Sequence, residues 1–190
     1  QLTGQALQII LDDDLDEKKK SYILSNHLLQ ADNNIEGCRW LIKAGDYHVR
    51  EARYQEGVEC YIQAISDLRN KPGDAIQRLF LQTVVKCLNI GFGQKDPDWI
   101  EEILSDALSR ANELNDRSHQ ALINMHLALN LWAQTQYLES LNHFKTGQAQ
   151  AREIDDPRFL KPISAISALY YFGQGRHRET VETYEQSVQD

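Results

Sequence analysis

The residues best suited to chemistry are an acidic run, six histidines and three cysteines. The run Asp12-Asp13-Asp14-Leu15-Asp16-Glu17 offers the oxygen ligands that calcium prefers. A calcium-binding loop would, however, need glycine where Glu17 stands and a bidentate glutamate where Ile23 stands. We therefore interpret the run as a solvated turn that places negative charge at the start of the helix that follows.

The histidines do not have the spacing of a metal site. His119 and His126 share a predicted helix face but lie two turns apart, about 10 Å along the axis, which is too far to bind one ion. His27 and His48 are expected to pack or hydrogen-bond between helices. No nucleophile with an evident base and no phosphate-binding glycine loop occurs, so the sequence predicts no enzyme activity, no metal site and no cofactor.

The cysteines and the composition indicate a cytoplasmic globular protein. Cys38, Cys60 and Cys87 stand far apart without a C-x-x-C motif, which is typical of reduced, buried thiols. The chain has 190 residues and a formal net charge of −8, which argues against binding to a nucleic-acid backbone. No apolar stretch approaches the length of a membrane span, and no signal peptide is recognisable.

The apolar residues repeat with a helical period nearly everywhere. Between Tyr54 and Leu68, for example, they recur at spacings of three and four, and no β-branched run with a period of two appears. We predict an all-α chain of about ten helices, cut apart by short clusters of turn residues. The predicted helices are 3–12, 16–31, 34–51, 54–70, 74–91, 97–115, 118–134, 137–153, 157–173 and 176–188.

Three windows of the sequence resemble one another. Each has a small residue, a ring nine positions later, and then a small or short residue, an aromatic and another small residue at helical spacing. The windows are Gly45-Tyr54-Gly57-Tyr61-Ala64, Ala128-Tyr137-Ser140-Phe144-Gly147 and Ala168-His177-Thr180-Tyr184-Ser187. This pattern resembles the tetratricopeptide repeat, and it predicts that Gly57 lies close to the paired helix, near Leu41, Ala44 and Gly45.

The resemblance implies a single domain over 1–190, built as a degenerate α-solenoid of stacked antiparallel helix pairs. Because the windows are unevenly spaced, an irregular helical bundle is the alternative. The expected divisions are leading helices over 1–33, a first repeat over 34–72, a degenerate second repeat over 73–116, a third repeat over 117–155 and a fourth over 156–190.

A second resemblance covers residues 21–65. The runs that carry it are Leu24-Ser25-Asn26-His27-Leu28-Leu29-Gln30-Ala31-Asp32, Arg39-Trp40-Leu41-Ile42-Lys43-Ala44-Gly45-Asp46 and Ala52-Arg53-Tyr54-Gln55-Glu56-Gly57-Val58. Together they are similar to the start of the helical-repeat region in STAND-type signalling ATPases, which include MalT-like and LuxR-type regulators and cyclase- or kinase-linked relatives. This resemblance implies a piece of a longer cytoplasmic regulator. The nucleotide-binding motif of that family is not found in this sequence.

The tetratricopeptide resemblance also implies a groove lined by the first helix of each pair. The residues carried over are Arg39, Ile42, Asp46, Val49 and Arg50 in the first repeat, Leu122, Met125, Leu129 and Trp132 in the third, and Ala165, Leu169 and Phe172 in the fourth. The groove would take an apolar helix, a peptide or a small effector. The alternative is that this face is core, covered by the rest of a longer chain.

Three functions follow as hypotheses. The first is a sensor module that binds a protein or effector and regulates an attached ATPase or output domain. The second is a stand-alone scaffold for protein assembly, and the third, a helical enzyme, finds no support among the motifs. We also expect weak self-association through the C-terminal helices, where Val181, Tyr184 and Val188 form an apolar stripe. Nucleic acid and membrane are not expected partners.

Overall fold

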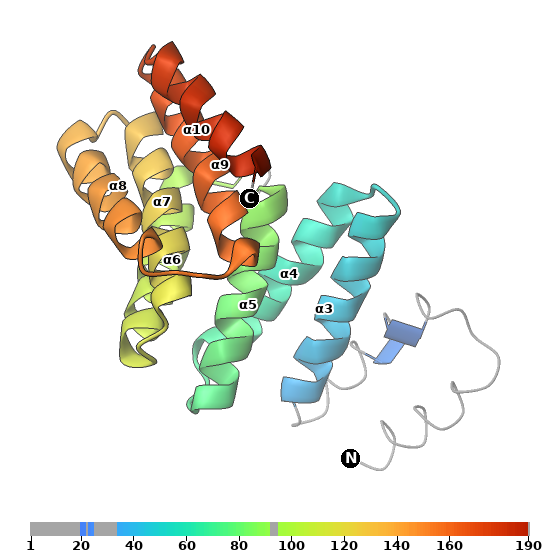
Figure 1. Cartoon of the computed structure of the whole chain (residues 1–190). Coiled ribbons are helices and arrows are strands. Elements are labelled where there is room, and N and C mark those ends of the chain that lie inside the picture. Colours follow the sequence, from blue (N-terminus) through green and yellow to red (C-terminus); the bar gives the residue numbers. More distant parts are fainter. Residues whose placement is uncertain (1–19, 22, 25–33, 92–94, 190) are drawn as a thin grey trace. The chain divides into compact units, whose positions relative to one another are not determined.

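The computed structural model describes residues 20, 21, 23, 24, 34–91 and 95–189. Within these residues the chain is all-helical, with eight complete helices and no strand (Figure 1). The predicted helix 3–12, most of the predicted helix 16–31 and the acidic run 12–17 lie outside the described residues. None of the described helices is long and apolar enough to cross a membrane.

The helix boundaries agree with the predicted ones to within two residues, because turn residues cut the apolar period where expected. Asp96 and Asp156 each precede a proline at a helix start, and they accept hydrogen bonds from the backbone N–H of Asp98 and Arg158, as is usual for residues that cap a helix. The helices are α3 (Asn34–Arg50), α4 (Tyr54–Arg69), α5 (Asp74–Ile90), α6 (Pro97–Glu113), α7 (Arg117–Ala133), α8 (Tyr137–Ala151), α9 (Pro157–Gly173) and α10 (His177–Gln189).

The chain divides into two compact units, residues 1–93 and 94–190. In the first unit α4 packs against both α3 and α5, and in the second unit α7 packs against α6, α8 and α9 while α10 packs against α9. The boundary between the units lies within the predicted second repeat, so its helices α5 and α6 belong to different units. One continuous domain over 1–190 stays a prediction.

Four helix-to-helix turns have the same backbone geometry. Ala52, Asn115, Thr135 and Gly175 each stand two residues before a helix and each adopts a positive φ, of 57°, 51°, 66° and 72°. In each turn the following residue donates its N–H to the carbonyl five positions earlier, at distances of 2.8–2.9 Å (Arg53 to His48, Asp116 to Ala111, Gln136 to Leu131, Arg176 to Tyr171). This is the hydrogen bond of a Schellman helix end. The turns therefore repeat in structure although their sequences differ.

The small residues of the repeat meet across the helix pair in both units. In the first unit a Cβ built on Gly57 would lie 3.2 Å from the carbonyl oxygen of Gly45. In the second unit the hydroxyl of Ser140 donates to the carbonyl of Ala128 at 2.8 Å. Gly45 pairs with Gly57 and Ala128 with Ser140 in the sequence windows, so the structure confirms a repeated helix pair.

The surroundings of Gly57 differ in part from those predicted. The nearest side chain to its Cβ position is Val49, whose Cγ2 would lie at 2.7 Å, and Leu41 and Ala44 are not among the three nearest atoms. The physical reason is that Gly57 lies in the first turn of α4, directly after the tight turn at residues 51–53, so it meets the last turns of α3. The close approach itself is as predicted.

The three cysteines are free and buried. Burial raises the pKa of the Cys38 and Cys60 thiols to about 11 and that of Cys87 to about 12. All three thiols are therefore protonated near neutral pH, and they serve as small core side chains.

Candidate binding pocket of the first unit

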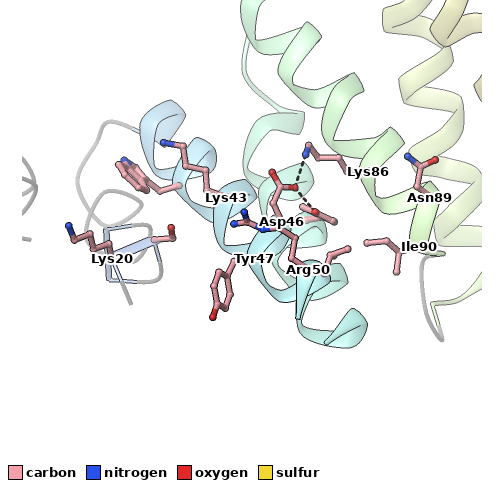
Figure 2. Close-up of a pocket in the computed structure, with 12 residues that line it drawn as sticks. Lys20, Lys43, Asp46, Tyr47, Arg50, Lys86, Asn89 and Ile90 are labelled. Atoms are coloured by element: carbon pink, nitrogen blue, oxygen red, sulfur yellow. Dashed lines mark hydrogen bonds and ion pairs between the residues drawn. The ribbon is translucent and has the colours of Figure 1, made fainter. Parts of the chain in front are cut away.

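One face of α3 forms a wall of a pocket in the first unit. Trp40, Lys43, Tyr47 and Arg50 follow one another at spacings of three and four residues, so they share a face of the helix. They line a cavity of about 720 Å³ together with α5 residues, shown in Figure 2. The remaining lining residues are Lys20, Ser21, Asp46, Val49, Tyr61, Lys86, Asn89 and Ile90.

A carboxylate ties three helices together inside this pocket. Asp46 Oδ1 on α3 accepts a hydrogen bond from the Tyr61 hydroxyl on α4 at 2.6 Å, and it pairs with Lys86 Nζ on α5 at 2.6 Å. Figure 2 draws both interactions as dashed lines. Burial and the hydrogen bond to Asp46 both raise the pKa of Tyr61, so its hydroxyl stays protonated and acts as a donor. Asp46 thus fixes the position of both partners.

Packing against the α3 backbone also fixes the position of the Tyr61 ring. A Cβ built on Gly45 would lie 2.5 Å from Cε1 of the Tyr61 ring, so the ring packs directly on the α3 backbone. Only glycine leaves room for this approach. The repeat pattern, Gly45 with Tyr61, therefore serves the pocket as well as the fold.

The cations of the pocket lie beside aromatic rings. Lys43 Nζ is 3.9 Å from the centroid of the Trp40 ring, and the Arg50 guanidinium carbon is 5.8 Å from the centroid of Tyr47. Such contacts stabilise a cation by about 0.5–1 kcal/mol at exposed sites. The rings hold the cations near the pocket without neutralising their charge.

The structure separates the predicted groove residues of the first unit. Asp46, Val49 and Arg50 line the pocket, as predicted. Arg39 lies outside it and pairs with Glu36 at 3.5 Å. Ile42 is only 7% exposed and belongs to the core, so it offers no surface to a partner. The exposed face of α3 is rotated by about one residue from the predicted one.

The predicted groove residues of the second unit also divide between core and surface. Met125 and Leu122 are fully buried, and Met125 Sδ would lie 2.8 Å from a Cβ built on Gly147. Leu129 and Trp132 are partly exposed, and Ala165 is exposed. Leu169 and Phe172, by contrast, are 59% and 61% exposed on α9. The ring of Trp132 packs beside Gly173, the neighbour of Phe172 in sequence.

Several pocket residues were not foreseen as groove residues. The polar members of this set are Lys20, Ser21, Lys43, Tyr47, Tyr61, Lys86 and Asn89. The spacing of Trp40, Lys43, Tyr47 and Arg50 was available as a signal, since an aromatic-and-basic stripe at helical spacing marks one exposed face. The pairing of Asp46 with Lys86, forty residues apart, has no local signal.

A smaller hollow of about 270 Å³ lies in the second unit and has a different chemistry. Asn124 donates to the side chain of Gln150 at 3.0 Å, and its Oδ1 lies 2.8 Å from His143 Nδ1. Gln150 in turn donates to Gln120 at 3.3 Å. These neutral groups satisfy one another, so the hollow is a structural hydrogen-bond network. Among the described residues no group of three or more metal-binding side chains occurs.

No family model matches the chain, and no curated protein matches its sequence. Among solved structures, the chain is similar to a crystal structure of MamA, with 13% identity, 92% of this chain and 88% of that chain covered, and a TM-score of 0.48. It is also similar to "MamA 41-end from Desulfovibrio magneticus RS-1", with 12% identity, coverages of 92% and 95%, and a TM-score of 0.44. Likenesses this distant settle nothing about function.

The repeated turns and the repeated small-residue contacts define the described chain as a helical-repeat protein. This class rests on contacts within the chain itself. Nothing in the described structure links the chain to signalling ATPases.

Proposed function

We propose that this chain is a binding module that assembles with a protein partner through the exposed sides of α3 and α9, each of which is the first helix of its pair. The observation that carries the proposal is the pocket on α3. Its cations and rings are held in place by the fold, yet they are left open to solvent. A scaffold of stacked helix pairs commonly uses such a surface for recognition.

The second unit supports the proposal in a different way. Leu169 and Phe172 are three positions apart on α9, so they lie on one face of the helix, and both side chains are more than half exposed. Large apolar side chains at such positions are typical anchors for a partner helix or peptide.

Two settings fit this module. A stand-alone assembly scaffold needs nothing beyond the helical repeat, and it is the simpler setting. Attachment to an ATPase or output domain of a cytoplasmic regulator rests on the sequence resemblance over residues 21–65 alone. In that setting a partner would act by favouring one state of the regulator over another.

Site-specific photo-crosslinking tests the proposal. A photoreactive residue is placed at Arg50 or Leu169 on the proposed binding side, and at the exposed positions Gln63 and Lys145 on the second helices as matched controls. Cells of the source organism are irradiated, and the products are identified by mass spectrometry. We expect one and the same protein to be captured from Arg50 or Leu169 but not from the controls.

Capture at equal yield from all four positions, or from none, would contradict the proposal. The setting is read from the parent gene: a Walker A motif in the same reading frame supports the regulator, and its absence supports the scaffold.

A further inference from the structure

We propose that the pocket of the first unit binds an organic phosphate of the nucleoside monophosphate class, with the phosphate between Lys43, Arg50 and Lys86. This goes beyond the proposed function, because it assigns a small ligand to the pocket on the same exposed side of α3.

The charge of the pocket is opposite to that of the chain. Among the described residues that line it, four are cationic, Lys20, Lys43, Arg50 and Lys86, and one is a carboxylate, whereas the whole chain carries −8. Among the described residues, only Lys86 of the four forms an ion pair. Like charges that line one pocket repel one another, and a bound anion lowers that repulsion. A phosphomonoester, with a charge of about −1.5 to −2, neutralises them better than a single carboxylate does.

The size of the pocket favours a small molecule. Its volume of about 720 Å³ lies within the range of roughly 300–1,000 Å³ that is usual for small-molecule sites. Trp40 and Tyr47 line it with aromatic surface on which a planar base can stack. A nucleoside monophosphate has both the charged end and the planar end that this combination requires.

The carboxylate of Asp46 distinguishes this ligand from an acidic peptide. Both partners of Asp46 in the described part of the chain, Tyr61 and Lys86, bind to Oδ1, so Oδ2 remains an acceptor for a ligand donor. The ribose hydroxyls of a nucleotide are such donors. Ionised aspartate or glutamate side chains of a peptide carry no donor of this kind.

Isothermal titration of the whole chain with AMP at low ionic strength tests the inference, with adenosine, inorganic phosphate and hexa-aspartate as comparison probes. We expect AMP to bind at one site, and to bind at least tenfold more tightly than any of the three comparison probes. The affinity should fall at 0.5 M salt, because the contacts are charge-assisted and partly exposed.

Two variants and a control locate the site. Lys43→Gln and Arg50→Gln should each weaken AMP binding about tenfold, since each removes one charged contact. Both side chains are exposed, so the fold should persist, and circular dichroism checks this. Lys145→Gln, an exposed lysine on α8 in the other unit, should leave AMP binding unchanged.

Three results would overturn the inference. They are no AMP binding, a loss of AMP affinity in Lys145→Gln equal to that in Lys43→Gln and Arg50→Gln, or tighter binding of hexa-aspartate or inorganic phosphate than of AMP. Each of these leaves the photo-crosslinking result unaffected, so failure of the ligand is distinguishable from failure of the proposed function. A captured partner with no AMP binding would refute the ligand alone.

Discussion

The two units share their repeat geometry but expose opposite kinds of surface. Seven of the eight large apolar side chains that are exposed among the described residues belong to the second unit, and only Tyr54 belongs to the first. The first unit instead exposes the cations and rings of its pocket. The turns at Ala52 and Thr135 are nevertheless built alike.

In both units the small residues and the turns determine the fold, while the exposed helix faces differ. Gly45 and Gly57 in one unit do what Ala128 and Ser140 do in the other. Function therefore has to be argued from each exposed face and not from the repeat.

The largest effect is expected where the helices approach most closely. Gly57→Leu should lower the free energy of unfolding by about 3 kcal/mol, because the new side chain meets Val49 and the Gly45 carbonyl. Gly57→Ala should cost less than about 1 kcal/mol, since the gain in helix propensity offsets most of the contact. Urea unfolding measures both.

Gln63→Leu, an exposed position on the same helix, is the control and should change stability little. Ser140→Ala tests the equivalent position in the second unit. It should cost about 1–2 kcal/mol, because the buried Ser140 hydroxyl bonds both to the Ala128 carbonyl and to the Tyr170 hydroxyl. Equal melting temperatures for the Leu and Ala variants of Gly57 would show that the approach is not close.

The second prediction uses pH to separate the units. Burial lowers the pKa of His126 to about 4, and it also lowers the pKa of His143. The unfolded chain then binds more protons than the folded chain below pH 6.5, so stability should fall as the pH drops from about 6.5 to 4. The loss due to His126 should be at most about 3 kcal/mol.

Urea unfolding at pH 7, 5.5 and 4.5 measures this loss, and His126→Gln, which cannot be protonated, should reduce it. Hydrogen exchange compares the two units: the amides of α7 in the second unit should lose protection before those of α4 in the first unit as the pH falls. An unchanged pH dependence in His126→Gln would contradict the assignment.

Most of the fold was predictable from the sequence because it depends on local patterns. The helical period and the turn residues located all eight described helices, and the caps at Asp96 and Asp156 were recognisable from the proline that follows each. The positive φ of Ala52 and Thr135 was not predictable from residue type. Neither is glycine, and the turn is imposed by the packing of the helix pair.

The site was predictable only in part, for a physical reason. Asp46 and Arg50 were named as groove residues, but the rotation of α3 about its axis depends on which neighbours cover it. That rotation decides that Ile42 is buried and Lys43 exposed. In the same way Met125 is buried because Gly147 on α8 admits it, a contact between residues 22 positions apart.

The third prediction concerns the turns. Thr135→Gly should stabilise the chain by about 0.5–1 kcal/mol, because a β-branched residue is strained at positive φ. Gly175→Ala should destabilise it by about 1 kcal/mol for the same reason. Thr146→Gly, the same substitution within α8, should instead destabilise by up to about 1 kcal/mol. Differential scanning calorimetry of the three variants tests whether the two turns are equivalent, and a destabilised Thr135→Gly would refute this.

The smallest effect is expected in self-association, and it concerns only the second unit. Val181 and Tyr184 on α10 are 55% and 62% exposed, three residues apart, and therefore on one face. An apolar face of this kind favours weak contact between copies of the chain at high concentration. Sedimentation velocity over a wide concentration range should show a fast, weak monomer–dimer equilibrium. Val181→Glu with Tyr184→Glu should abolish it, whereas Leu138→Glu, at an exposed apolar position on α8, should leave it intact. A chain that stays monomeric throughout would refute the prediction. An α10 variant that associates like the parent would refute it as well.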